Sequence, residues 1–255
     1  MADAPEAAKN HAVETYEAAQ NFSRLNAWLH GFRFRQLVKT ARALAPDSAQ
    51  IRPLRVLEFG CAHGKAFAAL DAALPISYLG VDQHAAFLAE AERLHGARPN
   101  FRALCASADA FAAEHAPTEA AQHGPFDFIF ALETLEHMPR DRVARLLDAI
   151  AALRPRLFVA SVPVEIGPAI LLKNVGSALT GYARHREYDW RETLWAACYR
   201  LDKLPPHACG HKGFDWRCLK AQIAQRFEIV RMRRFPLGPF PPGLSTSLYF
   251  EARPK

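Results

Sequence analysis

Apolar and polar residues alternate along this chain in two rhythms, one helical and one typical of strands. Near the start, apolar residues lie three or four positions apart, as in Phe22, Leu25, Leu29 and Phe32. This spacing predicts one or two amphipathic helices over residues 20–45. The next apolar run, LRVLEF at residues 54–59, is short and continuous, which is typical of a buried strand.

Strand-like runs and helical stretches then follow one another regularly as far as residue 163. The runs predict five strands, at residues 54–59, 76–81, 101–105, 126–132 and 157–162. Helices are predicted between them, at residues 65–74, 84–95, 108–115 and 140–153. Strands that alternate with helices of about ten residues form a parallel sheet with right-handed crossovers.

The rhythm changes after residue 163, where a region rich in aromatic residues, His and Arg begins. A helix is predicted at residues 217–226, followed by strands at residues 227–235 and 245–251. The link FPLGPFPPGL is too rich in Pro and Gly for a crossover helix, so these two strands are antiparallel neighbours. The expected fold is therefore an α/β fold with a seven-stranded sheet, an antiparallel C-terminal hairpin and helices on both faces.

Composition adds limits rather than a function. The 255 residues are 50% hydrophobic and 23% charged, which is typical of a globular protein. No apolar stretch approaches the roughly 20 residues of a membrane-spanning helix, and the acidic N-terminus is unlike a signal peptide, so we expect a cytoplasmic protein. The five cysteines contain no CxxC pair and are expected to be reduced. A net charge of +6 favours an anionic partner.

The segment VLEFGCAHGK at residues 56–65 carries the clearest chemical signal. Gly60 and Gly64 flank a tight turn between a strand and a helix, where glycine lets the backbone approach a ligand closely. The carboxylate of Glu58 before these glycines suits a ligand with a cationic amine. Asp82, at the end of the next strand, is placed to accept both hydroxyls of a ribose, and Asp109 follows the third strand.

These residues give the chain a clear resemblance to class I S-adenosylmethionine-dependent methyltransferases. It rests on VLEFGCAHG, YLGVDQ, ASADA, FDFIFALETLEHM and the antiparallel last strand. It implies a Rossmann-like fold, methyl transfer and S-adenosylmethionine as cofactor. Ala62 replaces the middle glycine of the family, which alanine permits if its φ stays negative. The cofactor-binding residues implied by the resemblance are Glu58, Gly60, Cys61, Gly64, Asp82, Gln83, Asp109, Ala110 and Leu132.

The resemblance also divides the chain into four parts. Residues 1–50 are expected to form a helical cap and residues 51–163 the cofactor-binding core. Residues 164–214 are the expected lid over the acceptor site, and residues 215–255 complete the sheet. The apolar positions Ile166, Ile170, Leu171, Val175 and Leu179 predict either a lid helix packed on the domain or a surface that contacts a membrane.

Two carboxylates and an imidazole follow the fourth strand, in Glu133-Thr-Leu-Glu136-His137. One interpretation is that Glu136 and His137 cap a helix or shape the crevice. The other rests on resemblance to ubiquinone-pathway O-methyltransferases and small-RNA 2′-O-methyltransferases. It makes Glu136, His137 and His211 catalytic, with Glu133, Glu136, His137 and His211 holding Mg²⁺, Mn²⁺ or Zn²⁺.

Three functions remain open at this stage. The leading one is methylation of a small-molecule or lipid-like acceptor, most simply on oxygen. The second is RNA 2′-O-methylation at the metal site, although no RNA-binding module is visible, which argues against nucleic acid. The third is a cofactor-binding interaction protein without catalysis. The sequence does not indicate an oligomeric state, nor does it explain the paired segments HREYDWR at 185–191 and HKGFDWR at 211–217.

Overall fold

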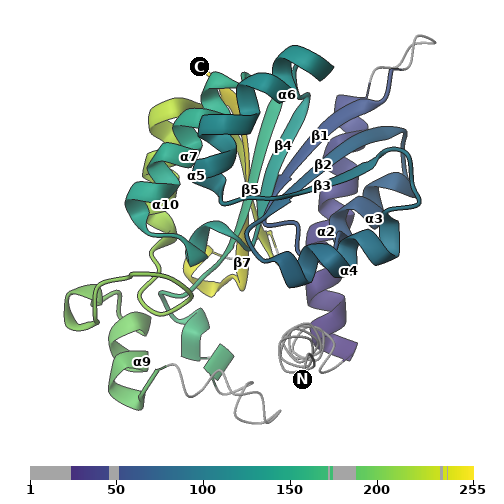
Figure 1. The fold of residues 1–255 in the computed structure, drawn as a ribbon. Helices are drawn as coiled ribbons and strands as arrows, with labels where there is room; N and C mark the ends of the chain where they lie inside the picture. Colours follow the sequence, from purple (N-terminus) through teal and green to yellow (C-terminus); the bar gives the residue numbers. More distant parts are fainter. Residues whose placement is uncertain (1–23, 46–51, 172, 175–187, 236–237, 240) are drawn as a thin grey trace, which may run out of the picture. The chain divides into compact units, whose positions relative to one another are not determined.

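A computed structural model describes residues 24–45, 52–171, 173–174, 188–235, 238–239 and 241–255 of the chain (Figure 1). Its strands follow the order β3-β2-β1-β4-β5-β7-β6 in a seven-stranded sheet. The predicted fold class is thereby confirmed, including the antiparallel hairpin at the C-terminal side. Two compact units divide the chain, residues 1–129 and residues 130–255.

The first unit contains a parallel group of strands with its connecting helices. Its elements are α2 (Arg24–Leu44), β1 (Leu54–Phe59), α3 (Lys65–Asp71), β2 (Ile76–Asp82), α4 (Ala85–His95) and β3 (Phe101–Cys105). Every residue of β1 is buried, as the continuous apolar run predicts. Strand β2 pairs with β1 and β3, and the pairs Phe59–Val81 and Asp82–Cys105 put the carboxyl ends of all three strands at one edge.

The helical region after β3 is longer than the sequence pattern predicts. It consists of α5 (Ala108–Ala110), a π-helical turn at Phe111–His115 and α6 (Ala116–His123). The predicted helix ends at residue 115, ahead of Pro117. Proline is tolerated there because it lies in the first turn of α6, where its missing N–H is not needed.

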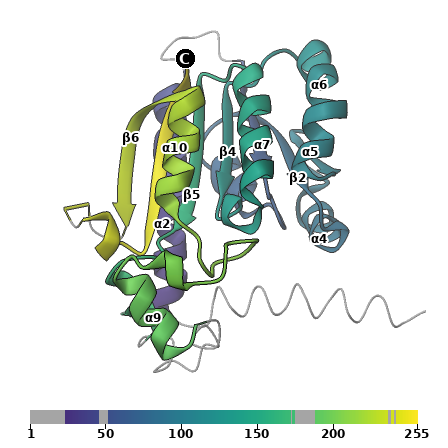
Figure 2. The same cartoon turned by 90° about the vertical axis from the view of Figure 1, so that its left-hand side faces the viewer.

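The second unit combines the end of β4 (Phe128–Leu132) with β5 (Leu157–Pro163), β6 (Phe227–Phe235) and β7 (Ser247–Pro254). Strand β7 is antiparallel to both β5 and β6 and lies between them. Helices α7 (Arg140–Ala152) and α10 (Trp216–Arg226) lie side by side against these strands (Figure 2). The guanidinium of Arg226 joins the two helices by pairing with Asp148 at 2.6 Å.

The segment after β5 departs most from the expectation. Ile166 and Ile170 are fully buried and Leu171 is 37% exposed, while Val175 and Leu179 lie outside the described residues. The first two residues of the predicted stripe are therefore core residues rather than a membrane-facing surface. Further along, α9 (Trp190–Ala197) and a 3-10 turn at Leu201–Lys203 have no counterpart in the predicted elements.

The paired DWR segments mark two helix starts. Asp189 is the N-cap of α9, in a capping box with Glu192, and Asp215 is the N-cap of α10. In each case the tryptophan that follows is the first helical residue. The likeness between the segments is therefore explained by helix capping for these positions, whereas residues 185–187 lie outside the described part.

The cysteines, the helices and one basic residue of the last hairpin bear on expectations drawn from composition. All five cysteines are free thiols. Within the described residues, no helix has the length and apolar character to cross a membrane. Among the basic residues, Arg233 on β6 pairs with Glu251 on β7 at 2.9 Å.

Candidate active site

The loop after β1 turns tightly through three residues in the left-handed region. The φ angles are 74° at Gly60, 46° at Ala62 and 76° at Gly64. The expectation of a negative φ at Ala62 is therefore wrong, and this alanine adopts a conformation that costs roughly 1–2 kcal/mol. Two features exclude a side chain at Gly64. One is its positive φ, and the other is that a Cβ would lie 2.7 Å from the ring of His95.

Asp82 holds this loop in place from the end of β2. Its carboxylate accepts hydrogen bonds from the backbone N–H of Ala62 at 3.0 Å and of His84 at 2.9 Å. The charge-assisted bond to Ala62 offsets part of the strain in that residue. The sequence assigns Asp82 to ribose binding only, and this second role in shaping the loop has no sequence signal.

Glu58 is a buried carboxyl group whose proton is held tightly. It is only 4% exposed, and it accepts a hydrogen bond from the hydroxyl of Tyr78. The pKa of Glu58 is raised to about 8, mainly by burial and also by the charge of Asp82. The hydrogen bond from Tyr78 and the positive charge of Arg33 on α2 act in the opposite direction.

The remaining predicted cofactor residues lie beyond the same edge of the first unit, with one exception. Cys61 is buried and Gln83 is exposed, each just past the end of its strand. Asp109 and Ala110 are half-buried in α5, where the hydroxyl of Ser107 accepts from the N–H of Ala110 at 3.2 Å. The exception, Leu132, belongs to the second unit, where it is 7% exposed.

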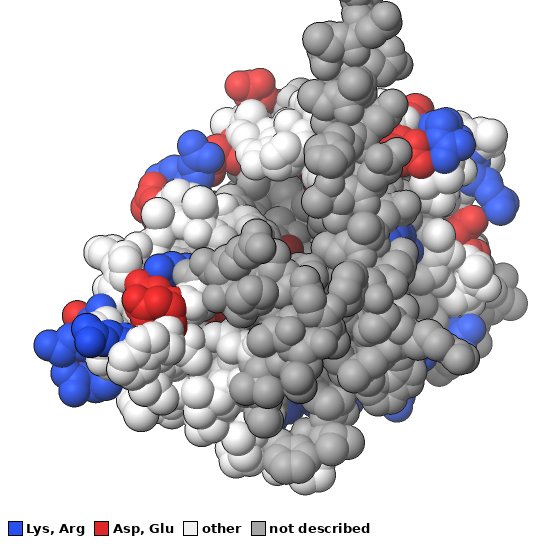
Figure 3. Space-filling view, turned by 90° about the horizontal axis from the view of Figure 1, so that it is seen from below, with Lys and Arg blue, Asp and Glu red and all other residues white. Residues whose placement is uncertain are grey.

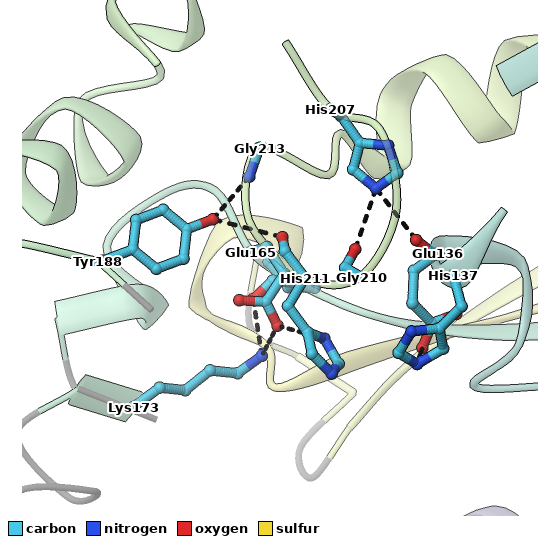
Figure 4. A network of polar contacts seen from close by, with 10 residues as sticks. Glu136, His137, Glu165, Lys173, Tyr188, His207, Gly210, His211 and Gly213 are labelled. Carbon is cyan, nitrogen blue, oxygen red and sulfur yellow. Dashed lines mark hydrogen bonds and ion pairs between the residues drawn. The ribbon is translucent and has the colours of Figure 1, made fainter. Parts of the chain in front are cut away.

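A network of polar side chains occupies the second unit (Figure 4). At its centre is Glu165, which is fully buried just after β5. One carboxylate oxygen lies 3.4 Å from the ammonium of Lys173 and 3.5 Å from Nδ1 of His211. The ammonium of Lys173 also donates to the carbonyl of Val164 at 2.7 Å. The buried charge of Glu165 is thus paired, as a charge removed from water must be.

His137 lies beside His211, with ring centroids 5.2 Å apart. Its Nε2 is 4.0 Å from a carboxylate oxygen of Glu136, which is fully buried. The pKa of His137 is lowered to about 4, mainly by the loss of surrounding water and also by the neighbouring His211 and His207. His137 is therefore neutral at ordinary pH.

Two residues outside the predicted site hold the loop that carries His211. Nε2 of His207 lies 3.0 Å from the carbonyl oxygens of both Glu136 and Gly210, so it carries the proton. The hydroxyl of Tyr188 accepts from the N–H of Gly213 at 2.8 Å and donates to the carbonyl of His211 at 3.3 Å. These bonds fix the backbone on either side of the His211 imidazole.

The four predicted metal ligands do not converge. Glu136, His137 and His211 are neighbours, but the carboxylate of Glu133 instead accepts from the hydroxyl of Ser161 at 3.0 Å. The backbone explains this, because Glu133 has a φ of 51° and its N–H donates to the carbonyl of Ser161. In the part of the chain that the structure describes, no group of three or more His, Cys, Asp or Glu side chains is spaced to hold an ion. The donor set therefore does not fit the predicted four-ligand site.

Sequence reasoning misses Glu165, Tyr188 and His207. Glu165 has a recognisable signal, since it is a single carboxylate inside the apolar run SVPVEIGPAI. The other two act through backbone groups far away in sequence, which leave no local pattern.

Comparison with known protein families gives a match for the central part of the chain. Residues 57–156 match the family model Methyltransf_12, described as a methyltransferase domain. Residues 57–156 are therefore a methyltransferase domain. In a sequence search, no protein of curated function matched this methyltransferase.

Solved structures share the fold of the methyltransferase at low sequence identity. Magnesium protoporphyrin IX methyltransferase from Synechocystis PCC 6803, with bound SAH, is 15% identical with a TM-score of 0.57, over 91% of this chain and 88% of that one. The N-methyltransferase NodS from Bradyrhizobium japonicum WM9 is 13% identical with a TM-score of 0.54, over 89% and 96%. The methyltransferase domain of bacterial CtHen1-C is 16% identical with a TM-score of 0.57, over 88% and 98%.

The side chains of the first unit suit the chemical groups of S-adenosylmethionine. The methionyl part of S-adenosylmethionine carries an ammonium group, which suits the buried, otherwise protonated carboxyl of Glu58. It also carries a carboxylate, and the Nε of nearby Arg33 is buried without a hydrogen-bond partner among the described residues. Within the turn, the N–H of Gly60 donates to the carbonyl of Val81 at 2.8 Å and that of Gly64 to the carbonyl of Cys61 at 2.9 Å, so the turn is fixed beside these side chains.

Proposed function

We propose that this methyltransferase transfers the methyl group to an oxygen of a small-molecule or lipid-like acceptor. The observation that carries this proposal is the pairing of the His211 imidazole with the fully buried carboxylate of Glu165 at 3.5 Å. A carboxylate at Nδ1 of a histidine orients the ring and stabilises its protonated form. Such a histidine suits removal of a proton from a hydroxyl group, a step that an oxygen acceptor requires.

Residues of the first unit hold the cofactor in this proposal. Glu58, Gly60, Cys61 and Gly64 bind the methionyl part, and Asp82 with Gln83 binds the ribose. Asp109 and Ala110 contact the adenine. When bound, S-adenosylmethionine supplies an activated methyl group, so the protein mainly positions the acceptor and excludes water.

In the second unit, His211 accepts the proton of the acceptor hydroxyl through Nε2, while the carboxylate of Glu165 lies 3.5 Å from Nδ1 and attracts the protonated ring. Neutral His137 and buried Glu136 form the adjoining wall of the acceptor site. Lys173 balances the charge of Glu165 when His211 is neutral. No step passes through a metal ion, because the donor set does not converge.

The test begins with finding the acceptor. The protein is incubated with S-adenosylmethionine carrying a deuterated methyl group and with separate pools of metabolites, lipids and RNA. Mass spectrometry then identifies the labelled product. A methyl ether or ester in the metabolite or lipid pool is the expected result. Labelled nitrogen or carbon would contradict the proposal, and label confined to RNA would favour 2′-O-methylation, with affinity that falls steeply as salt rises.

A control addresses catalysis without a known acceptor. Cofactor binding is measured by calorimetry in the same preparation. Tight binding with no labelled product in any pool would favour the third hypothesis, a cofactor-binding protein that acts through interactions.

A further inference from the structure

Helix α9 carries its large apolar side chains on the outside. Trp190, Leu194 and Trp195 are 68%, 45% and 36% exposed. The side chains that face the protein are small and buried: Thr193, Ala196 and Ala197. A helix on a protein surface normally has the opposite arrangement, with its large apolar residues inward. This outward face, which we call the tryptophan face, is defined by Trp190, Leu194 and Trp195.

The helix is firmly held, so the tryptophan face is a feature of the folded protein. The N–H of Gly167 donates to the carbonyl of Ala196 at 2.9 Å, which joins α9 to the segment after β5. Ala196 and Ala197 pack with Ile170 and Leu204 in a buried apolar cluster. At the other end, Lys212 pairs with Glu192 at 2.7 Å.

Basic side chains accompany the tryptophan face. The guanidinium of Arg191 lies 5.2 Å from the ring centroid of Trp190, and Arg191 is itself exposed. Arg200 and Lys203 are exposed just beyond the helix, where Arg200 pairs with Asp202 at 2.9 Å and Lys203 adds a further positive charge. In Figure 3, uncharged side chains cover much of the left of the view, where basic side chains lie at the edge together with some acidic ones. The chain as a whole has a net charge of +6.

We propose that the tryptophan face docks on the surface of an anionic lipid bilayer. A single helix exposes a convex face, which suits a planar surface better than a pocket. Tryptophan rings favour the level of the lipid head groups, and arginine beside them is attracted to anionic lipids. The binding combines burial of apolar area with charge attraction, as for other helices that lie in a membrane interface. This proposal goes beyond the methyl transfer proposed above and does not depend on it.

The test is binding of the full-length protein to vesicles of phosphatidylcholine, with or without phosphatidylglycerol, measured by co-sedimentation and by tryptophan fluorescence. The wild type should bind the anionic vesicles and show a blue shift. The triple variant Trp190→Gln, Leu194→Gln, Trp195→Gln should bind at least about tenfold more weakly. Arg191→Gln should weaken binding to anionic vesicles only.

Two matched controls remove exposed apolar side chains elsewhere. Leu94→Gln on α4 and Val230→Gln on β6 change residues that are 48% and 41% exposed. Both should bind vesicles like the wild type. If the triple variant does not fold, the single variant Trp190→Gln decides, with an expected loss of about threefold.

Three results would overturn the proposal. The wild type does not bind anionic vesicles, or the folded Trp190→Gln and triple variants bind as well as the wild type. The third result is that sedimentation shows the wild type as a dimer and the triple variant as a monomer, while neither binds vesicles. The tryptophan face would then be a contact between two copies of the chain.

Discussion

The hydroxyl of Tyr78 on β2 donates a hydrogen bond to the buried carboxyl of Glu58 on the neighbouring strand β1. Glu58 keeps its proton up to about pH 8 in the folded protein, compared with a usual pKa of 4.5. The unfolded chain releases this proton at the lower pH, so folding becomes less favourable as the pH rises between these values.

Replacing Glu58 removes this penalty. We expect Glu58→Gln to stabilise the cofactor-free protein by about 2 kcal/mol at high pH and much less near pH 5. Urea unfolding at several pH values measures the difference in free energy of unfolding. Tyr78→Phe is the matched variant, and it should steepen the pH dependence because it removes a bond that lowers the pKa of Glu58. Parallel pH curves for wild type and Glu58→Gln would contradict the prediction.

At position 62, a change to glycine should not destabilise the protein, unlike most such substitutions. Because its φ is 46°, Ala62→Gly relieves left-handed strain and should leave stability unchanged or raise it by up to about 1 kcal/mol. Ala68→Gly, in the middle of α3, should lower stability by about 1 kcal/mol. Thermal unfolding compares the two variants. Equal destabilisation by both would show that Ala62 is not strained.

Asp82 has two roles that two variants separate. Asp82→Asn removes the charge but keeps one acceptor oxygen, so one of the two bonds to Ala62 and His84 remains; we expect about tenfold weaker binding of S-adenosylmethionine and a smaller loss of stability than in Asp82→Ala. Asp82→Ala also removes the bonds to Ala62 and His84 and should reduce both affinity and stability. Calorimetry and thermal unfolding give the two quantities. If both variants bind S-adenosylmethionine as tightly as the wild type, Asp82 does not belong to the cofactor site.

His211 and Glu165 should act together in turnover. Once the acceptor is known, we expect His211→Asn to lower kcat by a factor of about 100 or more, and Glu165→Gln to lower it less while shifting the pH profile. Cofactor affinity should not change in either variant. EDTA should leave wild-type turnover unchanged. Loss of turnover in EDTA, restored by Mn²⁺ or Mg²⁺, would show that the metal prediction from the sequence is correct.

Tyr188 should stabilise the loop that carries His211. Tyr188→Phe leaves the N–H of Gly213 without its partner, at a cost of about 1–3 kcal/mol. Hydrogen exchange should accelerate across residues 205–214 and stay unchanged in β5. Tyr199→Phe, which changes an exposed tyrosine, is the control. Equal protection in Tyr188→Phe and wild type would show that the loop does not rely on this hydroxyl.

The sequence predicts the strands best where burial is continuous. The predicted bounds of β1, β3 and β6 are those of the structure. The predicted fourth strand begins two residues early, at Phe126. The reason is Asp127, whose carboxylate accepts from the N–H of Arg55 at 2.9 Å and pairs with Arg52 at 2.6 Å, so it anchors the chain just before β4.

The site is less predictable, because its geometry depends on contacts distant in sequence. The pattern Glu-x-x-Glu-His gives the residue types, but it does not reveal that Ser161 binds the carboxylate of Glu133. Nor does it indicate that Glu165 lies next to His211, 46 positions further along the chain. Helix α9 is not predicted because its inward residues are Thr and Ala, which give no apolar stripe.

The place of β7 between β5 and β6 has a consequence for synthesis on the ribosome. Strand β6 leaves the ribosome before β7, yet β7 is its partner in the sheet. Until residues 247–254 emerge, β5 lacks its β7 neighbour and β6 lacks its partner. Unpaired strand edges are prone to association with other chains. While it is being synthesised, the second unit therefore passes through a stage in which β5 and β6 have unpaired edges. We expect aggregation to be fastest at this stage, and a chaperone that covers unpaired strands to be most useful there.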